Sequence, residues 1–191
     1  METKVMKKFF GLADFVEEQE FLQKQHKAGW KLKTFKALKK YTFEKCEPVE
    51  YIYQLDFNEE GKYEEAYIQM FEDCGWEYIM KYQKWYYFRK AKCDVGENDN
   101  SIFSDAESKI DMCKKVYKTQ GIAIFPLLAV ISCWNVLIIP NIDNISIWLI
   151  IGGSLCIILI VFFFGMGIAN FSKLNKMIKE IQNPLDTNEK K

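Results

Sequence analysis

Two long apolar runs, residues 121–139 and 145–169, constrain this chain more than any other feature of its sequence. Neither run contains a charged side chain, and each is about as long as the helix of about 20 residues that crosses a hydrocarbon core. Only Pro140–Asn144 separates them, which is too short a connection for a folded domain. The sequence therefore predicts a two-helix transmembrane hairpin in the cell membrane, with the lipid bilayer as a partner.

Lysines lie on the outer sides of both runs. Four precede the first run and three follow the second, whereas the connection carries only Asp143. By the positive-inside rule, both termini are expected in the cytoplasm. No apolar stretch follows the polar start of the chain, so we expect no cleavable signal peptide. The flanking lysines are Lys109, Lys114, Lys115, Lys118, Lys173, Lys176 and Lys179.

The charge balance argues against a nucleic-acid-binding protein. The 26 basic and 26 acidic side chains leave no cationic excess, which phosphate neutralisation normally requires. The six cysteines are scattered without a CxxC pair, so free thiols are expected in a cytoplasmic setting.

Residues 1–92 have the pattern of a cytoplasmic α+β domain. A strand is expected at 6–11, then a helix from an Asp14 N-cap to Ala28, then two strands of alternating polarity near 30–34 and 41–44. The second half repeats this order, with strands expected at 51–57, 76–82 and 85–90. Its amphipathic helix is expected at 62–74.

Two sequence anchors recur in both halves. Gly29-Trp30 matches Gly75-Trp76 at an offset of 46, and residues 41–45 match residues 86–90 at an offset of 45. We interpret the domain as a duplication with repeats of about 5–46 and 49–92. The predicted fold class is α+β, a duplicated strand-helix-strand-strand domain (ferredoxin-like or effector-binding-like) before the transmembrane hairpin.

The repeat also sorts the aromatic residues 85–88. Tyr86 and Phe88 should face the helices, which places Trp85 and Tyr87 on the opposite face of the sheet. Aromatic side chains on both faces imply that a ligand, a partner or the juxtamembrane helix covers the second face.

The segments next to the hairpin are expected to be helical. Residues 93–120 are predicted to be a linker followed by a helix from Ser104 that runs into the first span. Residues 170–191 are predicted to be an amphipathic helix up to Asn183-Pro184 and a charged tail. These two extensions could pair side by side below the membrane.

Groups that could perform catalysis are sparse. The only histidine, His26, has no metal-spaced partners, so an ordinary surface or partly buried role is favoured, and no Walker or HExxH motif occurs. Glu17, Glu18 and Glu20 fit a helix first turn, where carboxylates complement the helix dipole. Asn135 is expected to link the two spans, and solute transport is disfavoured. We expect no catalytic residue, metal or cofactor.

The aromatic sheet is the best candidate for a binding site. A simple interpretation is core plus interface. A sharper one is an aromatic pocket with a carboxylate, suited to a small amphipathic or cationic ligand through cation–π contact. The candidate ligand-binding residues are Trp85, Tyr87, Trp30, Trp76, Tyr51, Tyr53 and Glu50, with Glu44 and Glu77 as further carboxylates.

Several motifs together resemble a family of bacterial membrane proteins, domain of unknown function 2812. They are KAGW (27–30), YTFEK (41–45), YIYQLDF (51–57), FEDCGWEY (71–78), WYYFRK (85–90) and IFSD (102–105). The resemblance covers about residues 4–115. It implies a cytoplasmic α+β domain joined to membrane helices, often beside regulators of the PadR type, and it implies no active site. A weaker likeness of topology is to effector-binding domains of multidrug-responsive regulators, in which aromatic residues and a buried carboxylate hold cationic ligands.

These features predict a non-enzymatic regulatory or sensory membrane protein whose cytoplasmic domain binds a protein partner or a small amphipathic ligand. The alternative is an accessory subunit that assembles through the hairpin with a larger, transporter-type membrane complex or with copies of itself. An enzyme is the least favoured class.

Overall fold

The computed structural model describes residues 2–36, 40–59, 63–92, 107–119, 129 and 147–188. The chain forms two compact units, Met1–Lys115 and Val116–Lys191, and each is described by itself.

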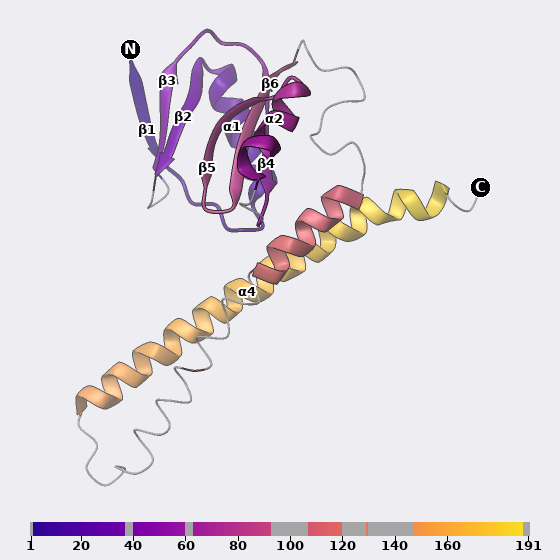
Figure 1. Ribbon diagram of the computed structural model, residues 1–191. Helices are drawn as coiled ribbons and strands as arrows, with labels where there is room; N and C mark the ends of the chain where they lie inside the picture. The colour runs from indigo at the N-terminus through magenta and orange to yellow at the C-terminus, as the bar shows by residue number, and fades with distance from the viewer. Residues whose placement is uncertain are drawn as a thin grey trace. The chain divides into compact units, whose positions relative to one another are not determined.

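Within residues 3–91 of the first unit, two small antiparallel sheets of three strands pack with helices α1 and α2. The strand orders are β1-β3-β2 and β4-β6-β5, so each repeat places its third strand between its first and second (Figure 1). The predicted α+β class and the strand-helix-strand-strand order of both halves are confirmed. The elements are β1 (Thr3–Lys7), α1 (Phe15–Lys27), β2 (Trp30–Lys36), β3 (Lys40–Lys45), β4 (Tyr51–Phe57), α2 (Glu64–Asp73), β5 (Glu77–Tyr82) and β6 (Trp85–Ala91).

The two repeats share fine details of backbone geometry. The β2–β3 register shifts between Leu32 and Thr34, and the β5–β6 register shifts between Tyr78 and Met80, at the same offset of 46 as the glycine anchors. Gly29 and Gly75 end the two helices with φ values of 84° and 80°. This left-handed conformation is strained for side chains other than glycine, which explains the residue at both positions.

Three local predictions need correction. The first strand is Thr3–Lys7 rather than 6–11, because pairing with β3 fixes its register, and Phe9 is left exposed beyond the strand. Asp14 stands at the N-cap position of α1 without a capping hydrogen bond from its side chain; its carboxylate accepts the Gly11 N–H instead. Helix α2 is far more exposed than its amphipathic pattern predicts, since Phe71 is its only buried residue.

Helix α1 packs against both sheets. Phe21 contacts Tyr41 and Phe43 of β3, with ring centroids 5.6 and 6.0 Å apart. Phe15, one turn and a half earlier, contacts Trp85 of β6 at 5.5 Å. The helix is therefore part of the core of the unit, with six of its residues buried.

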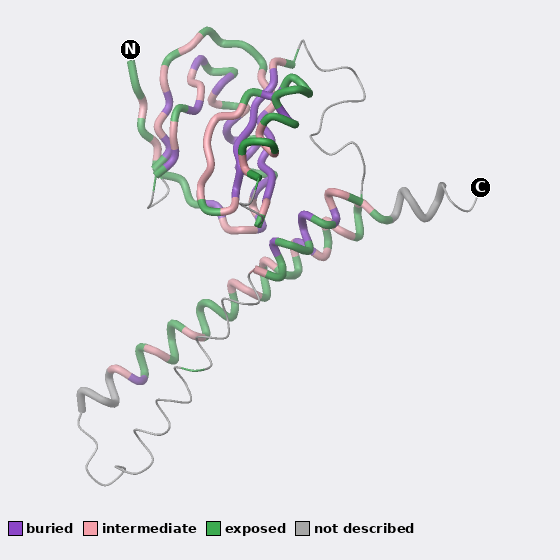
Figure 2. The backbone as a smooth tube through the Cα atoms, in the orientation of Figure 1, coloured by how far each residue is buried: buried purple, intermediate pink, exposed green. Residues whose placement is uncertain are grey.

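The second sheet is covered on both faces. Tyr86 and Phe88 pack beneath α2, where Phe71 lies 4.6 Å from Phe88 by ring centroids. This confirms the face predicted from the repeat. Trp85 and Tyr87, on the other face, are buried by the first repeat, chiefly by α1. Figure 2 shows the mostly buried β4 and β6 of this sheet near the mostly exposed α2.

A single long helix, α4 (Ile147–Asn188), dominates the second unit. Its 42 residues extend about 63 Å at 1.5 Å per residue, and Gly152–Gln182 is long and apolar enough to cross a membrane. The predicted amphipathic segment after residue 170 continues the same helix without a break. The helix extends to Asn188, beyond the end predicted at Asn183-Pro184.

A second helix, residues 107–119, confirms the helical prediction before the first apolar run. Its Tyr117 contacts Phe171 of α4, with ring centroids 5.0 Å apart, which agrees with the predicted side-by-side extensions. The predicted span at 121–139 lies outside the described residues, apart from the helical Ala129.

Candidate functional site

Four of the seven predicted ligand-binding residues lie in separate places. Trp85 packs between Phe15 and Phe57, and the Tyr87 hydroxyl donates to Glu18 Oε1 at 2.8 Å. Trp76 is buried in the cluster beneath α2, and Trp30 is half-buried with Lys4 Nζ 5.5 Å from its ring. They do not form one pocket.

The other three, Glu50, Tyr51 and Tyr53, meet at the start of β4 beside α1. An open groove with a volume of about 710 Å³ runs along this surface. Phe21, Tyr51 and Ile52 provide its apolar lining, and charged side chains form most of its remaining lining. The polar residues are Glu17, Glu20, Gln23, Lys24 and Lys27 of α1 together with Lys8, Glu50 and Lys92.

Glu50 holds two cations at one side of the groove. Its carboxylate pairs with Lys27, and Lys92 Nζ lies 2.8 Å from Glu50 Oε2. Hydrogen bonds from these two lysines lower the pKa of Glu50 to about 2, and Lys27 has the larger effect. The main chain adds a third link, because the Lys92 N–H donates to the Glu50 carbonyl at 3.0 Å. The groove thus contacts the residue that directly follows β6.

Tyr51 connects the groove to a polar network inside the domain. Its ring stacks on His26 at 4.2 Å with an interplanar angle of 8°. His26 is only 3% exposed, and its Nδ1 lies 2.9 Å from the Tyr53 hydroxyl. The Leu32 N–H donates to the same hydroxyl at 3.3 Å. His26 is therefore a buried member of a network, which corrects the prediction of an ordinary surface or partly buried residue.

Burial, and then the positive charges of Arg89 and Lys31, lower the pKa of His26 to about 4. The ring is consequently neutral at pH 7. Since the Tyr53 hydroxyl already accepts the Leu32 N–H, the simplest arrangement has this hydroxyl donating to His26 Nδ1.

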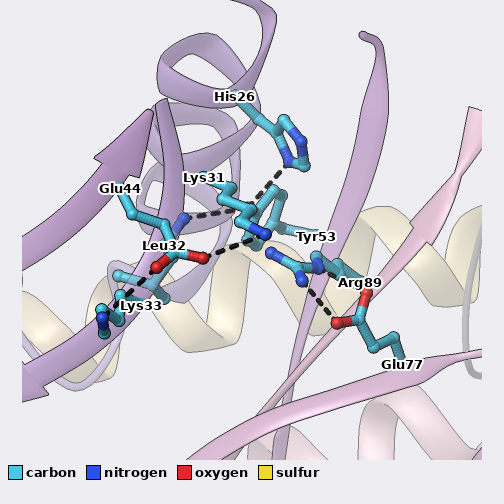
Figure 3. A network of polar contacts seen from close by, with 8 residues as sticks. All are labelled: His26, Lys31, Leu32, Lys33, Glu44, Tyr53, Glu77 and Arg89. Carbon is cyan, nitrogen blue, oxygen red and sulfur yellow. Dashed lines mark hydrogen bonds and ion pairs between the residues drawn. The ribbon is translucent and has the colours of Figure 1, made fainter. Parts of the chain in front are cut away.

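Two ion pairs complete the network, one from each repeat (Figure 3). Lys31 pairs with Glu44 across β2 and β3 at 2.9 Å, and Arg89 pairs with Glu77 across β6 and β5, with Nε donating at 2.6 Å. The repeat offset makes the two pairs equivalent, but the acid and the base have exchanged strands. Lys33 also contacts Glu44, at 3.4 Å.

A buried carboxylate, Glu18, occupies the space between the two sheets. Its Oε1 accepts hydrogen bonds from the Tyr41 and Tyr87 hydroxyls at 2.7 and 2.8 Å, and the residue is 5% exposed. Burial and the Glu18 charge raise the pKa of both tyrosines above its ordinary value. This carboxylate links the two repeats, although its first-turn position had suggested only a helix-dipole role.

Glu18, His26 and Arg89 are buried polar residues of this region, although the sequence suggested a helix-dipole role for Glu18, an ordinary role for His26 and none for Arg89. A periodic signal was present for the first two, because positions 15, 18, 22 and 26 lie on one face of a helix and Phe15 and Leu22 are apolar. Arg89 follows Trp85 and Tyr87 at period two, so it belongs to the covered face of the second sheet.

Within the described residues, no group of three or more His, Cys, Asp or Glu side chains is placed to hold a metal ion. What the arrangement offers is binding chemistry: an apolar strip, a charged rim, and the buried guanidinium of Arg89 near the Tyr51 ring.

The family model "Protein of unknown function (DUF2812)" matches residues 14–125, and the chain belongs to this family. Searches of curated proteins and of solved structures each gave no match.

Proposed function

We propose that this chain, a member of the DUF2812 family, is a non-enzymatic, membrane-anchored regulatory or sensory protein whose α+β domain binds a small amphipathic ligand in the groove beside α1. The observation that carries the proposal is the lining of this groove. Phe21, Tyr51 and Ile52 can take up the apolar part of a ligand, while the lysines and glutamates can pair with its polar head.

The surroundings of the groove favour a signalling role. Lys92 pairs with Glu50 in the groove and directly follows strand β6. A ligand that competes for Lys27 or Lys92 would disturb this contact. We infer that occupancy passes through the juxtamembrane helix to the membrane segment, whose candidate span is Gly152–Gln182.

Ligand binding can be tested on the full chain in detergent by thermal unfolding with a set of hydrophobic cations and anions, including tetraphenylphosphonium and 1-naphthoate. A ligand at 100 times its Kd adds about 2.7 kcal/mol to the free energy of unfolding, which corresponds to a rise in Tm of several degrees. We expect such a rise in the wild type and its loss in Tyr51→Ala.

Tyr63→Ala is the matched control, because Tyr63 is 74% exposed and precedes α2, outside the groove lining. It should keep the full ligand response. Equal stabilisation of Tyr51→Ala and the wild type, or no stabilisation of the wild type by any compound, would contradict binding in the groove.

We further propose a two-pass topology with both termini in the cytoplasm. The flanking lysines and the lack of charge in both apolar runs support it. Alkaline phosphatase fused after Asp143 should be active outside the cytoplasm, and the same enzyme fused after Lys191 should be inactive. An active fusion after Lys191 together with an inactive fusion after Asp143 would contradict the proposal and indicate the opposite orientation in the membrane.

An accessory subunit of a larger membrane complex is the second candidate. The observation in its favour is that α4 exposes large apolar side chains in succession, including Val161, Phe162, Phe163 and Phe164. Lipid can cover such a surface, and so can partner helices. Crosslinking in membranes should recover a stable larger assembly if this alternative holds, and monomer only if it does not.

A further inference from the structure

An unpartnered nitrogen lies inside the polar network at the junction of the two repeats. Arg89 is 9% exposed and uses Nε and Nη2 to bind Glu77, but its Nη1 is buried without a hydrogen-bond partner among the described residues. A buried guanidinium N–H without an acceptor is costly, so such an atom usually marks a water or an ion.

Positive charge gathers at the same place. Lys31 acts electrostatically on both His26 and Glu77, and Arg89 acts on His26, so the two cations share one neighbourhood (Figure 3). Two like charges in one neighbourhood repel each other, and an anion bound between them would offset this repulsion. Their present carboxylate partners lie to either side, Glu44 for Lys31 and Glu77 for Arg89.

The charges of the network do not balance. Lys31, Lys33 and Arg89 contribute three positive charges, and Glu44 and Glu77 contribute two negative charges. His26 from α1 and Tyr53 from β4 complete the surroundings and are both neutral at pH 7, because burial lowers the pKa of His26 and raises the pKa of Tyr53. The network therefore carries one net positive charge, which one monovalent anion would neutralise.

We propose that this junction is a binding site for a small oxyanion, a carboxylate or a phosphate group, held by Arg89 Nη1 and Lys31 Nζ. Charge-assisted hydrogen bonds from a guanidinium and an ammonium are the usual means of holding such groups. The Lys31 side chain is 34% exposed and the Glu77 side chain 55% exposed, so the network reaches solvent. This site is separate from the proposed groove, since neither Arg89 nor Lys31 lines the groove.

The chain provides its own reporter for this site. His26 is the only histidine among the 191 residues, so the full chain in detergent, labelled with ¹³C-histidine, gives one imidazole signal from beside the site. Inorganic phosphate and acetate are titrated separately, with sodium chloride at matched ionic strength. A bound oxyanion should shift the signal saturably at millimolar concentration and raise the pKa of His26, because a negative charge stabilises the imidazolium.

Two lysine variants provide the control. Lys31→Gln removes a proposed ligand and should weaken anion binding at least tenfold. Lys33→Gln removes the same unit of charge, but this side chain is 53% exposed and holds no anion in the proposal, so solvent screening should limit the loss to about threefold. Arg89→Lys keeps the charge but removes Nη1, and should also weaken binding; the dispersed His26 signal shows whether each variant is folded.

A response to phosphate alone assigns the site to phosphoryl groups, and a response to acetate alone assigns it to carboxylates. An effect of chloride equal to that of both oxyanions, no saturable shift in the folded wild type, or equal affinity in Lys31→Gln and Lys33→Gln would overturn the proposal and leave Arg89 Nη1 to water. The result is independent of Tyr51→Ala, so the groove and this site can fail separately.

Discussion

The two repeats have the same strand order but use their helices differently. Helix α1 buries six residues and contacts both sheets, whereas α2 buries only Phe71 and covers one face of its own sheet. The cause lies in β6, where Trp85 and Tyr87 occupy the positions that Lys40 and Thr42 hold in the first repeat. The second sheet thus presents an additional apolar face, and α1 covers it. The two halves share a backbone arrangement, but their unequal side chains leave only α1 packed against both sheets.

Glu18 and Glu64 provide the sharpest contrast, because they occupy equivalent positions of the two helices at an offset of 46. Glu18 is buried and accepts from Tyr41 and Tyr87, while Glu64 forms a partly exposed ion pair with Lys81 at 2.7 Å. Glu18→Ala should lower the free energy of unfolding by about 3–5 kcal/mol, since it leaves a cavity and two buried hydroxyls without an acceptor. Glu64→Ala should cost less than about 1 kcal/mol.

Urea denaturation of both variants at pH 7 measures the difference. Glu18→Gln keeps an acceptor oxygen and should recover part of the loss. Similar costs for Glu18→Ala and Glu64→Ala would mean that the two helices contribute equally.

The repeats should also respond to pH in opposite directions. Burial, Arg89 and Lys31 lower the pKa of His26 from 6.5 to about 4, so the unfolded chain binds the proton more readily, and stability should rise as pH increases from 4 to 6.5. Burial raises the pKa of Asp56 from 3.8 to about 6, so the folded chain binds the proton more readily, and stability should fall as pH increases from 4 to 6.

Each effect amounts to roughly 3 kcal/mol over its range, so the two largely cancel in the wild type. Urea denaturation between pH 4 and 6.5 separates them. His26→Gln should leave a stability that falls with rising pH, and Asp56→Asn a stability that rises with it. Parallel pH profiles for the two variants would show that these groups do not titrate as their burial requires.

Gly29 and Gly75, which end α1 and α2 at positive φ, test a feature that the two repeats share. Gly29→Ala and Gly75→Ala both place a side chain at positive φ, which costs about 1–2 kcal/mol. Gly29→Ala should be the worse of the two, because its Cβ would lie 3.2 Å from the Cys46 carbonyl oxygen, whereas at Gly75 it meets only the flexible end of Lys90 at 3.4 Å. Thermal unfolding of the two variants measures the order, and a costlier Gly75→Ala would contradict it.

The sequence predicted local structure well because the repeat places the same signals in both halves. Gly29-Trp30 and Gly75-Trp76 marked two helix ends, and the period-two pattern placed Tyr86 and Phe88 toward α2. The location of α1 against Trp85 was not predictable in this way, because periodicity shows which face is apolar but not which element covers it.

The candidate site was predictable to the same extent, because the sequence indicated residues of one strand but not their tertiary contacts. Glu50, Tyr51 and Tyr53 were named from an aromatic strand, and the structure brings them to the groove and the network behind it. His26 was predicted to have an ordinary role and Arg89 was not singled out, because a single titratable residue on a helix or strand gains meaning only when tertiary packing places it beside another. Their pairing depends on contacts between repeats that neither repeat encodes alone.

Hydrogen exchange of the full chain tests most directly the claim that α1, and not α2, is the helix around which the domain and its site are built. Amides of α1 should exchange as slowly as those of β6, through global unfolding. Amides of α2 should exchange at least 100-fold faster, through local opening, because Phe71 is its only buried residue. Equal protection of the two helices, or faster exchange in α1, would contradict the claim.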